Sequence, residues 1–170
     1  CYLRDYQSEN YSFADRTLTL KATDITLNQA DSPTFIGVRQ SEFETRLRVN
    51  VAGDADEAGI SFYMDEDQHY DLAVRSDKEC RRVILRIKSG DAEEIKASIK
   101  LDKDIKEVVL KVVSSPVNYS FYCGDGEDET LLGTVRTKYL SSEVAGGFTG
   151  VVMGMYAVAK DSDRFAQFRE

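Results

Sequence analysis

The feature that most constrains this chain is a period-two alternation of apolar and polar residues, which recurs along most of its length. Between residues 43 and 51 the odd positions, from Phe43 to Val51, are apolar or β-branched, and the even positions are polar. Residues 106–113 and 117–123 repeat this pattern. Because successive side chains of a β-strand point to opposite faces, the alternation predicts strands with one face on a core and the other in water. Further strands are expected at residues 18–22, 34–40, 60–64, 70–74, 82–88, 94–99 and 151–158. The last is a nearly continuous apolar run, typical of a strand buried on both faces.

Turn-forming residues separate these runs at regular intervals. Clusters of Gly, Asp, Ser or Glu lie at residues 52–54, 65–67, 89–91 and 124–126. The Asp125-Gly126 pair is typical of a tight hairpin turn, since glycine tolerates positive φ and aspartate caps its own backbone. About ten to thirteen short strands with turns every 8–12 residues predict an all-β fold, a sandwich or jelly roll of antiparallel sheets. We expect one such domain over residues 1–170.

The composition limits the partners of the chain. Its 170 residues include 30 acidic and 22 basic side chains, a net charge of −8. An acidic surface repels phosphate backbones, so nucleic acid is not an expected partner. No apolar run is long enough for a membrane-spanning helix, so no membrane partner is expected. No signal-peptide pattern begins the sequence, although a mature secreted chain would have lost one.

Cysteine and histidine are too scarce for several kinds of site. Cys1, Cys80 and Cys123 show no metal-ligand spacing, and His69 is the one histidine. We expect idle or buried thiols, and a Cys80–Cys123 disulfide stays open as an alternative. A nucleophilic triad would need His69 as its base, but the chain has no Gly-x-Ser-x-Gly motif to present a serine. His69 is therefore expected to be a surface or packing residue, and no catalytic residue is assigned.

Acidic and aromatic residues suggest two other kinds of site. Glu42 and Glu44, or the acids at 65–67, offer paired carboxylates, but thirty acidic residues produce such pairs by chance. A structural Ca²⁺ bound by turn carboxylates stays open, although the acids after Cys123 do not match an EF-hand, so metal content is unassigned and no cofactor is expected. Aromatic side chains stack on sugars. The candidates for an exposed sugar-binding platform are Tyr63, Tyr70 and Tyr122.

Several segments together resemble one known family. Residues 31–40 (DSPTFIGVRQ) resemble a segment of the C-terminal concanavalin A-like β-sandwich attached to glycoside hydrolase family 43 enzymes, the β-xylosidases and α-arabinofuranosidases. In that family's order follow residues 57–60, 68–70, 119–122 and 131–133, and then the closing motif at 140–157, LSSEVAGGFTGVVMGMYA. The segments cover nearly the whole chain, and the combination is specific where each segment alone is weak.

The resemblance implies an ancillary domain in hemicellulose breakdown. Family 43 catalysis resides in a separate five-bladed propeller, so no acid of this chain inherits a catalytic role. In some relatives a sandwich loop reaches the rim of the propeller's substrate pocket. The matching positions here are Phe148 with Gly146, Gly147 and Thr149, and we expect the face near Phe35 and Arg39 to join that interface.

One alternative function and two departures from the family pattern accompany the resemblance. The chain could instead be an autonomous carbohydrate-binding module that uses Tyr63, Tyr70 or Tyr122 to bind xylo- or arabino-oligosaccharides. Where the family commonly has Arg-Arg-Gln, this chain has Val38-Arg39-Gln40, and the hairpin after Cys123 lacks the family's tryptophan. Cys1 is either the lipidated cysteine of a bacterial lipoprotein or a boundary within a longer enzyme. Tyr2-Leu3-Arg4 is typical of the edge of a folded domain and not of the polar tether of a lipoprotein, so it favours the boundary. The resemblance favours a periplasmic or extracellular location over a cytoplasmic one.

Overall fold

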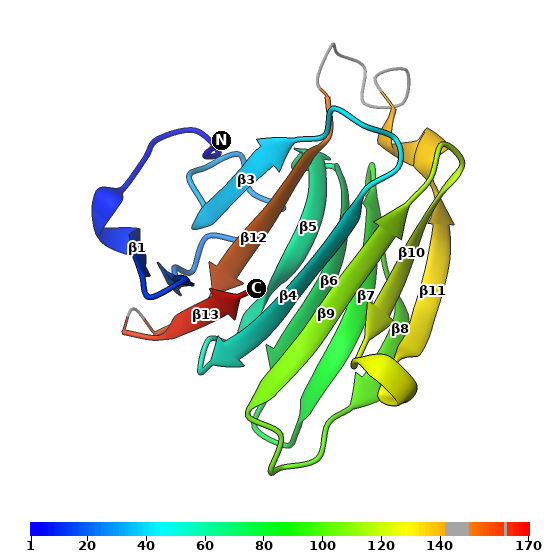
Figure 1. Ribbon diagram of the computed structural model, residues 1–170. Coiled ribbons are helices and arrows are strands. Elements are labelled where there is room, and N and C mark those ends of the chain that lie inside the picture. The colour runs from blue at the N-terminus through cyan, green and yellow to red at the C-terminus, as the bar shows by residue number, and fades with distance from the viewer. Residues whose placement is uncertain (142–149, 162) are drawn as a thin grey trace.

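Two antiparallel β-sheets face each other in the computed structural model, which describes residues 1–141, 150–161 and 163–170 (Figure 1). One sheet has seven strands, in the spatial order β1 (Tyr11–Ala14), β2 (Thr17–Lys21), β13 (Phe165–Arg169), β4 (Arg46–Gly53), β9 (Glu107–Ser114), β10 (Asn118–Cys123) and β11 (Thr130–Arg136). The other has six, in the order β3 (Phe35–Arg39), β12 (Val152–Val158), β5 (Glu57–Asp65), β6 (Gln68–Ser76), β7 (Arg81–Ser89) and β8 (Ala92–Lys100).

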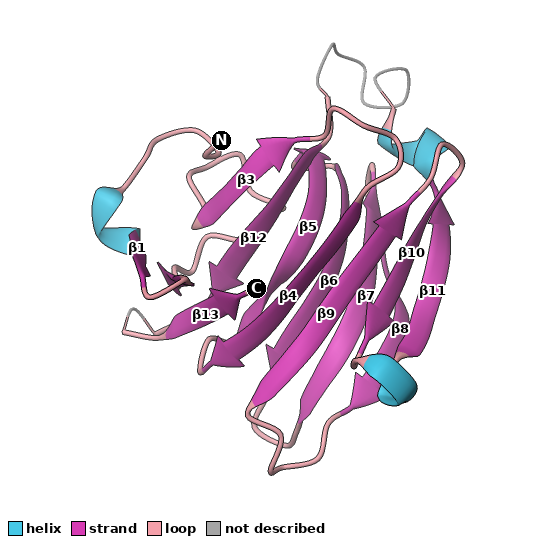
Figure 2. Cartoon of the chain, in the orientation of Figure 1, coloured by secondary structure: helices cyan, strands magenta, loops and turns pink. Residues whose placement is uncertain are grey.

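Short 3₁₀ turns are the helical elements of the described residues: η1 (Ser8–Asn10), η2 (Gly126–Asp128) and η3 (Thr137–Leu140) (Figure 2). None of them has the length or apolar character needed to cross a membrane. Nearly all other regular secondary structure in the described residues is β-strand, as the alternation predicts.

The core lies between the two sheets and is built from the alternating residues. Val108, Leu110 and Val112 of β9 are at most 5% exposed, and they pack with Phe62 of β5 and Phe121 of β10. Burying each such side chain contributes roughly 1.5–3 kcal/mol. The predicted alternation is therefore confirmed within β9 and β10, but Val117, expected to face the core, precedes β10 and is 62% exposed.

The strand at Val152–Val158 is buried on both faces, as its apolar run predicts. Met155 and Ala157 pack into the core between the sheets. Tyr156 belongs instead to a second apolar cluster on the outer face of the six-stranded sheet, with Phe35 and Leu27. Strand β12 occupies an interior position of the sheet, between β3 and β5.

The second cluster exists because residues 22–34 cross the outer face of the six-stranded sheet. This segment leaves β2 and forms a bridge between Thr23 and Val158. The Ala159 amide then donates to the Thr23 carbonyl at 2.9 Å, and Leu27 lies 3% exposed in the cluster. The outer face is consequently partly covered by chain, whereas an ordinary sandwich face meets water.

Two other local predictions differ from the structure. Phe43 was expected to face the core, but β4 begins at Arg46, and the Phe43 side chain lies in the preceding loop, 74% exposed. The Asp125-Gly126 pair was expected to form a tight hairpin, but six residues including η2 join β10 to β11. Gly124 and Gly126 do adopt positive φ, and the Asp125 carboxylate accepts from the Gly126 amide, so the turn chemistry holds in a longer loop.

Candidate functional site

Most of the expected interface residues cannot be placed. Phe148, Gly146, Gly147 and Thr149 lie outside the described residues. Arg39 is exposed at the end of β3, and a Cβ added to Gly150 would lie 2.9 Å from its Nη1 atom. The Arg39 side chain therefore passes directly over the residue at which the described chain resumes.

Phe35 is not available to a partner, contrary to expectation. Its side chain is fully buried in the outer-face cluster, where the ring packs over Gly154 of the neighbouring strand. A Cβ at Gly154 would lie 2.2 Å from the ring, so glycine is the residue that lets this ring lie flat on the sheet.

The tyrosine platform expected from the sequence is also not formed. Tyr70 is fully buried in the core, and its hydroxyl donates to the Arg136 carbonyl at 3.0 Å. Tyr63 is 7% exposed and stacks on His69, with 5.7 Å between ring centroids. Tyr122 is half-buried, and the ammonium group of Lys111 lies 4.7 Å from its ring centroid. The strand parity of Tyr63 and Tyr70 places them on covered faces, so neither can stack on a sugar.

The three cysteines are free. Cys1 is exposed, Cys80 is half-buried and Cys123 is buried, which confirms the expectation of idle or buried thiols and excludes the Cys80–Cys123 disulfide. Burial raises the pKa of the Cys123 thiol above its ordinary value. Over residues 1–141, 150–161 and 163–170, no group of three or more His, Cys, Asp and Glu side chains is arranged to hold a metal ion.

Four elements with an exposed apolar residue meet at one end of the sandwich: the end of β3, the loop before β4, the turn from β9 to β10, and η3, which lie at the upper end of the ribbon in Figure 1. We call this the loop end and define it by Val38, Phe43, Val117 and Tyr139, which are between 43% and 74% exposed. Val38 is the second-last residue of β3, Phe43 precedes β4, Val117 lies in the turn between β9 and β10, and Tyr139 lies on η3.

Hydrogen bonds hold the loop end in one arrangement. Ser114 Oγ donates to the Phe43 carbonyl at 2.7 Å, and it accepts from the Thr45 amide at 2.9 Å. Gln40 Nε2 donates to the Glu42 carbonyl, and Gln40 Oε1 accepts from the Tyr119 hydroxyl at 2.7 Å. These bonds tie loop 40–45 to β9 and β10, so the apolar side chains are presented by a fixed backbone.

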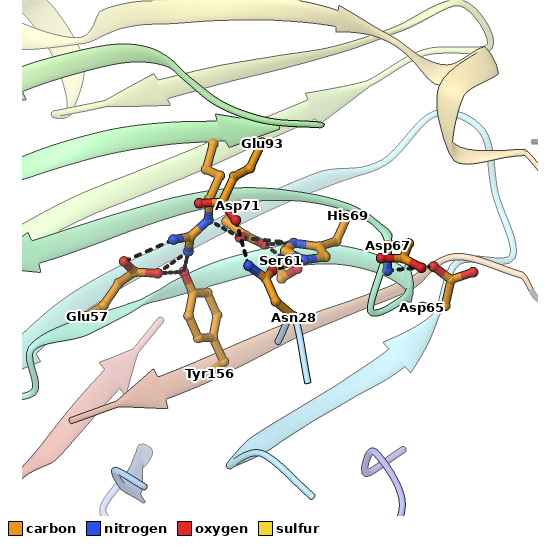
Figure 3. A network of polar contacts seen from close by, with 10 residues as sticks. Asn28, Glu57, Ser61, Asp65, Asp67, His69, Asp71, Glu93 and Tyr156 are labelled. Atoms are coloured by element: carbon orange, nitrogen blue, oxygen red, sulfur yellow. Dashed lines mark hydrogen bonds and ion pairs between the residues drawn. The ribbon is translucent and has the colours of Figure 1, made fainter. Parts of the chain in front are cut away.

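A buried polar network lies on the outer face of the six-stranded sheet (Figure 3). Its centre is a line of three residues in register on neighbouring strands: Ser61 on β5, Asp71 on β6 and Arg86 on β7. The Ser61 hydroxyl donates to Asp71 at 2.7 Å, and Arg86 Nε donates to Asp71 at 2.8 Å. Directly opposed residues on adjacent strands are natural partners, so the hairpin register brings these groups together.

The guanidinium of Arg86 joins this line to two more groups. It donates to both carboxylate oxygens of Glu57 and lies 3.2 Å from the hydroxyl of Tyr156. That hydroxyl donates to Glu57 at 2.6 Å. Burial disfavours the charge of Arg86, but the surrounding Tyr156, Asp71 and Glu57 raise its pKa above the ordinary value. Burial and the Glu57 carboxylate raise the pKa of Tyr156.

His69 extends the network to the segment that covers the face. This histidine is predicted from the sequence to be a surface or packing residue, and in the structure it is fully buried. Its Nδ1 lies 3.0 Å from Asp71, and its Nε2 lies 2.8 Å from Asn28 Oδ1. The Asn28 amide donates to Glu93 at 2.5 Å. Burial would raise the pKa of Asp71, but His69, Arg86 and Ser61 together hold it at about 2.

A cleft opens beside this network on the same outer face. Its volume is about 770 Å³, and Glu57, Arg86 and Tyr156 contribute to its lining. The remaining lining comes from Asp24 and residues 26–28 of the covering segment, from Asp56 and Glu93, from residues 75–78 at the end of β6 and just after it, and from residues 158–161 and 164 at and beyond the end of β12. Sequence reasoning missed this cleft and its network.

Fold and surfaces together define the class of protein: a concanavalin A-like sandwich of two antiparallel sheets, with an apolar loop end and a polar outer-face cleft. The family model for the β-xylosidase C-terminal concanavalin A-like domain matches residues 1–170. The chain therefore belongs to this family, the C-terminal domain of glycoside hydrolase family 43 enzymes, and the resemblance and fold expected from its motifs are confirmed.

Individual relatives agree with this assignment. The chain is 34% identical over 145 residues to a non-reducing end α-L-arabinofuranosidase of Bacteroides ovatus, covering 83% of this chain and 27% of that protein. A solved family 43 structure of the xyloglucan utilisation locus of B. ovatus matches with TM-score 0.82, 30% identity, 98% coverage of this chain and 34% of that one. A family 43 protein of Bacillus licheniformis shares the fold, with TM-score 0.87, 18% identity, and coverage of 98% and 35%. The chain thus spans about a quarter to a third of these relatives.

Proposed function

We propose that this chain is a non-catalytic ancillary domain that docks, through its loop end, on the catalytic propeller of the same polypeptide. The observation that carries the proposal is that four large apolar side chains are exposed on elements that meet at this end. Monomeric surfaces seldom keep such side chains together unless a partner covers them. The short match to much longer glycosidase relatives supports a catalytic domain in the same polypeptide as that partner.

The path of the chain near Cys1 also supports docking through the loop end. Cys1 and Gly37 exchange backbone hydrogen bonds, and Tyr2 forms an antiparallel bridge with Ile36. In an antiparallel pair the partner of a later residue is an earlier one. A residue preceding Cys1 in a longer polypeptide would therefore run beside Val38 and Arg39, toward the loop end.

The docked loop end would shape the outer edge of the propeller's substrate pocket. Phe148 in the closing motif is the residue we propose for the rim, on the resemblance of its sequence segment. The sugar preference would then belong to the propeller, with a xyloside or an arabinoside as the substrate class that the names of the family and of the B. ovatus relative suggest.

The test uses the natural polypeptide that contains these residues. Val117→Asp and Phe43→Asp place a charge on the loop end, and Leu131→Asp is the matched control. Leu131 is 52% exposed and lies on β11 beside Tyr122, near the opposite end of the sandwich. Thermal unfolding and hydrolysis of aryl xylosides and aryl arabinofuranosides are the two measurements.

We expect the two loop-end variants to split one unfolding transition into two and to lower activity, because a buried unpaired charge disfavours the docked state. Leu131→Asp should leave both measurements unchanged, and Phe148→Ala should lower activity on short substrates without splitting the transition. Hydrolysis by the 170-residue chain alone, or equal behaviour of all three Asp variants, would refute the proposal.

A further inference from the structure

We propose that the cleft on the outer face of the six-stranded sheet binds a short, uncharged oligosaccharide. This inference goes beyond docking on a catalytic domain and uses a different surface of the molecule. It also replaces the tyrosine platform, whose members Tyr63 and Tyr70 are buried.

The size and placement of the cleft suit a small ligand. Its volume of about 770 Å³ falls within the range of roughly 300–1,000 Å³ that is usual for small-molecule sites. Five strands of one sheet supply lining residues: Glu57 from β5, Arg75 and Ser76 from β6, Arg86 from β7, Glu93 from β8, and Tyr156 and Val158 from β12. Loop segments line the rest of the cleft, so the polar groups stand on a rigid sheet beneath more variable walls.

The charges of the lining argue for a neutral ligand. Acidic and basic side chains are nearly balanced: the lining residues are Asp24, Asp56, Glu57, Asp77, Glu93 and Asp161 against Arg75, Lys78, Arg86, Lys160 and Arg164. Many of these charges are already paired. Arg86 is held by Glu57 and Asp71, and Arg164 is held by Asp56 and Asp161. Neither an anion nor a cation would therefore meet a strong excess of opposite charge.

Hydrogen-bond donors and hydrogen-bond acceptors both line the cleft, and hydroxyl groups of a ligand can pair with either. A hydroxyl both donates and accepts, whereas carboxylates only accept and guanidinium groups only donate. A chain of hydroxyls can satisfy alternating acids and bases along a wall, and an oligosaccharide is such a chain without net charge. The amide of Asn28 and the hydroxyls of Thr26 and Ser76 add neutral partners to the same lining.

The base of the cleft is fixed before any ligand arrives. The side chains of Arg86 and Glu57 are 12% exposed, and the Tyr156 residue is 1% exposed. Arg86 uses four N–H groups to bind Asp71, Glu57 and Tyr156. A guanidinium has five, so one N–H on Nη1 has no partner among the described residues. Groups that are already ordered lose little freedom when a ligand binds.

The test is calorimetric titration of the 170-residue chain with two neutral probes, xylotetraose and arabinotetraose, and an anionic one, trigalacturonic acid. Arg75→Gln and Lys78→Gln change cleft side chains on its rim. The Arg75 side chain is half exposed and 4.0 Å from Glu57, so its removal leaves no deeply buried charge without a partner. Arg46→Gln is the matched control, an exposed arginine on β4 of the other sheet.

We expect saturable binding of at least one neutral probe, about ten-fold weaker in Arg75→Gln because a hydrogen bond to a charged group is lost. Arg46→Gln should bind within about two-fold of the wild type, the scatter expected for a change that removes no contact. In ¹⁵N NMR spectra, the probe should shift resonances of residues 24–28 and 75–78. Circular dichroism of each variant establishes that it is folded.

Several results would overturn the inference. No saturable heat with either neutral probe would do so, as would binding that neither rim variant weakens, or tighter binding of the anionic probe. Resonance shifts confined to the loop end would place any ligand elsewhere. These outcomes are separate from the docking proposal, because Arg75→Gln should leave the unfolding of the longer polypeptide in a single transition.

Discussion

Replacing Arg86 by methionine tests whether the outer-face network stabilises the fold. Methionine is of similar length and fills the space of the arginine stem, so the substitution removes the charge with little change in packing. It leaves Glu57 and Asp71 without the guanidinium that each of them contacts. The Asp71 side chain is fully buried and that of Glu57 is 12% exposed, so water can replace the lost partner only in part.

The expected loss follows from this burial. Removing one partner of a buried ion pair typically costs about 3–5 kcal/mol, because the remaining charge stays desolvated. Chains of this size lose about 2–4 °C of melting temperature per kcal/mol, so the melting temperature should fall by roughly 6–20 °C. The deficit should also depend on pH. Arg86 is one of the groups that hold the pKa of Asp71 low, so protonating the carboxylates at low pH should narrow the gap between variant and wild type.

Urea denaturation measures the loss of stability and its dependence on pH. The chain has nine tyrosines and no tryptophan, so tyrosine fluorescence and far-UV circular dichroism are the two signals, recorded at pH 7 and at pH 3. Arg46→Met on the exposed face of β4 is the control, with an expected change within about 0.5 kcal/mol. A loss below about 1 kcal/mol for Arg86→Met at pH 7, or a gap that widens at pH 3, would refute the reasoning, because a buried charge must then have found another partner.

Three further predictions follow from individual residues. In a ¹³C NMR titration, the Asp71 carboxyl of the folded protein should titrate near its pKa of about 2. Its ionisation should contribute roughly 2 kcal/mol to the free energy of unfolding, complete above about pH 4 and lost as the pH falls toward 2. A titration midpoint above 3.8 would contradict this prediction. Gly59→Ala places a Cβ 2.2 Å from the Leu72 carbonyl oxygen and should cost about 2–3 kcal/mol in urea, more than Gly133→Ala, where a side-chain methyl of Leu85 is the nearest atom. Ellman's reagent should modify the exposed Cys1 at once and the buried Cys123 only on unfolding, and equal rates would disprove the buried placement.

The strands of the core could be predicted from the sequence because the two facing sheets impose a period of two. Val108, Leu110 and Val112 show this pattern, and all three are buried. The pattern failed where few residues carry it. Strand β13 buries only Ala166 and Phe168, and it is positioned by pairing with β2 and β4, which lie more than a hundred residues earlier. Strand β11 was missed as well, since Gly133 interrupts its alternation and a bulge shifts its register against β10.

The polar network could not be predicted, because alternation assigns its residues to water. Ser61, Asp71 and Arg86 are adjacent only through the register of two hairpins. Their faces are covered by residues 22–34, whose path no local pattern encodes. One signal was present in the sequence: Tyr63 and Ile84 share the parity of the network residues, and two apolar side chains on a supposed water face indicate that something covers it.

Strand β12 connects the two surfaces to which we assign functions. It forms the C-terminal part of the closing motif at 140–157, so its position determines where that part of the motif lies in the sheet. Tyr156 anchors the strand by its hydroxyl to Glu57 and Arg86, and by its ring to the cluster around Phe35. Because the Tyr156 hydroxyl donates to Glu57 and lies against the Arg86 guanidinium, the buried network holds β12 in one place. A docking end needs such a fixed support, since a loop displaced by an ångström loses the contacts that orient it. The same side chains thus form the base of the cleft and stiffen the strand that carries the closing motif.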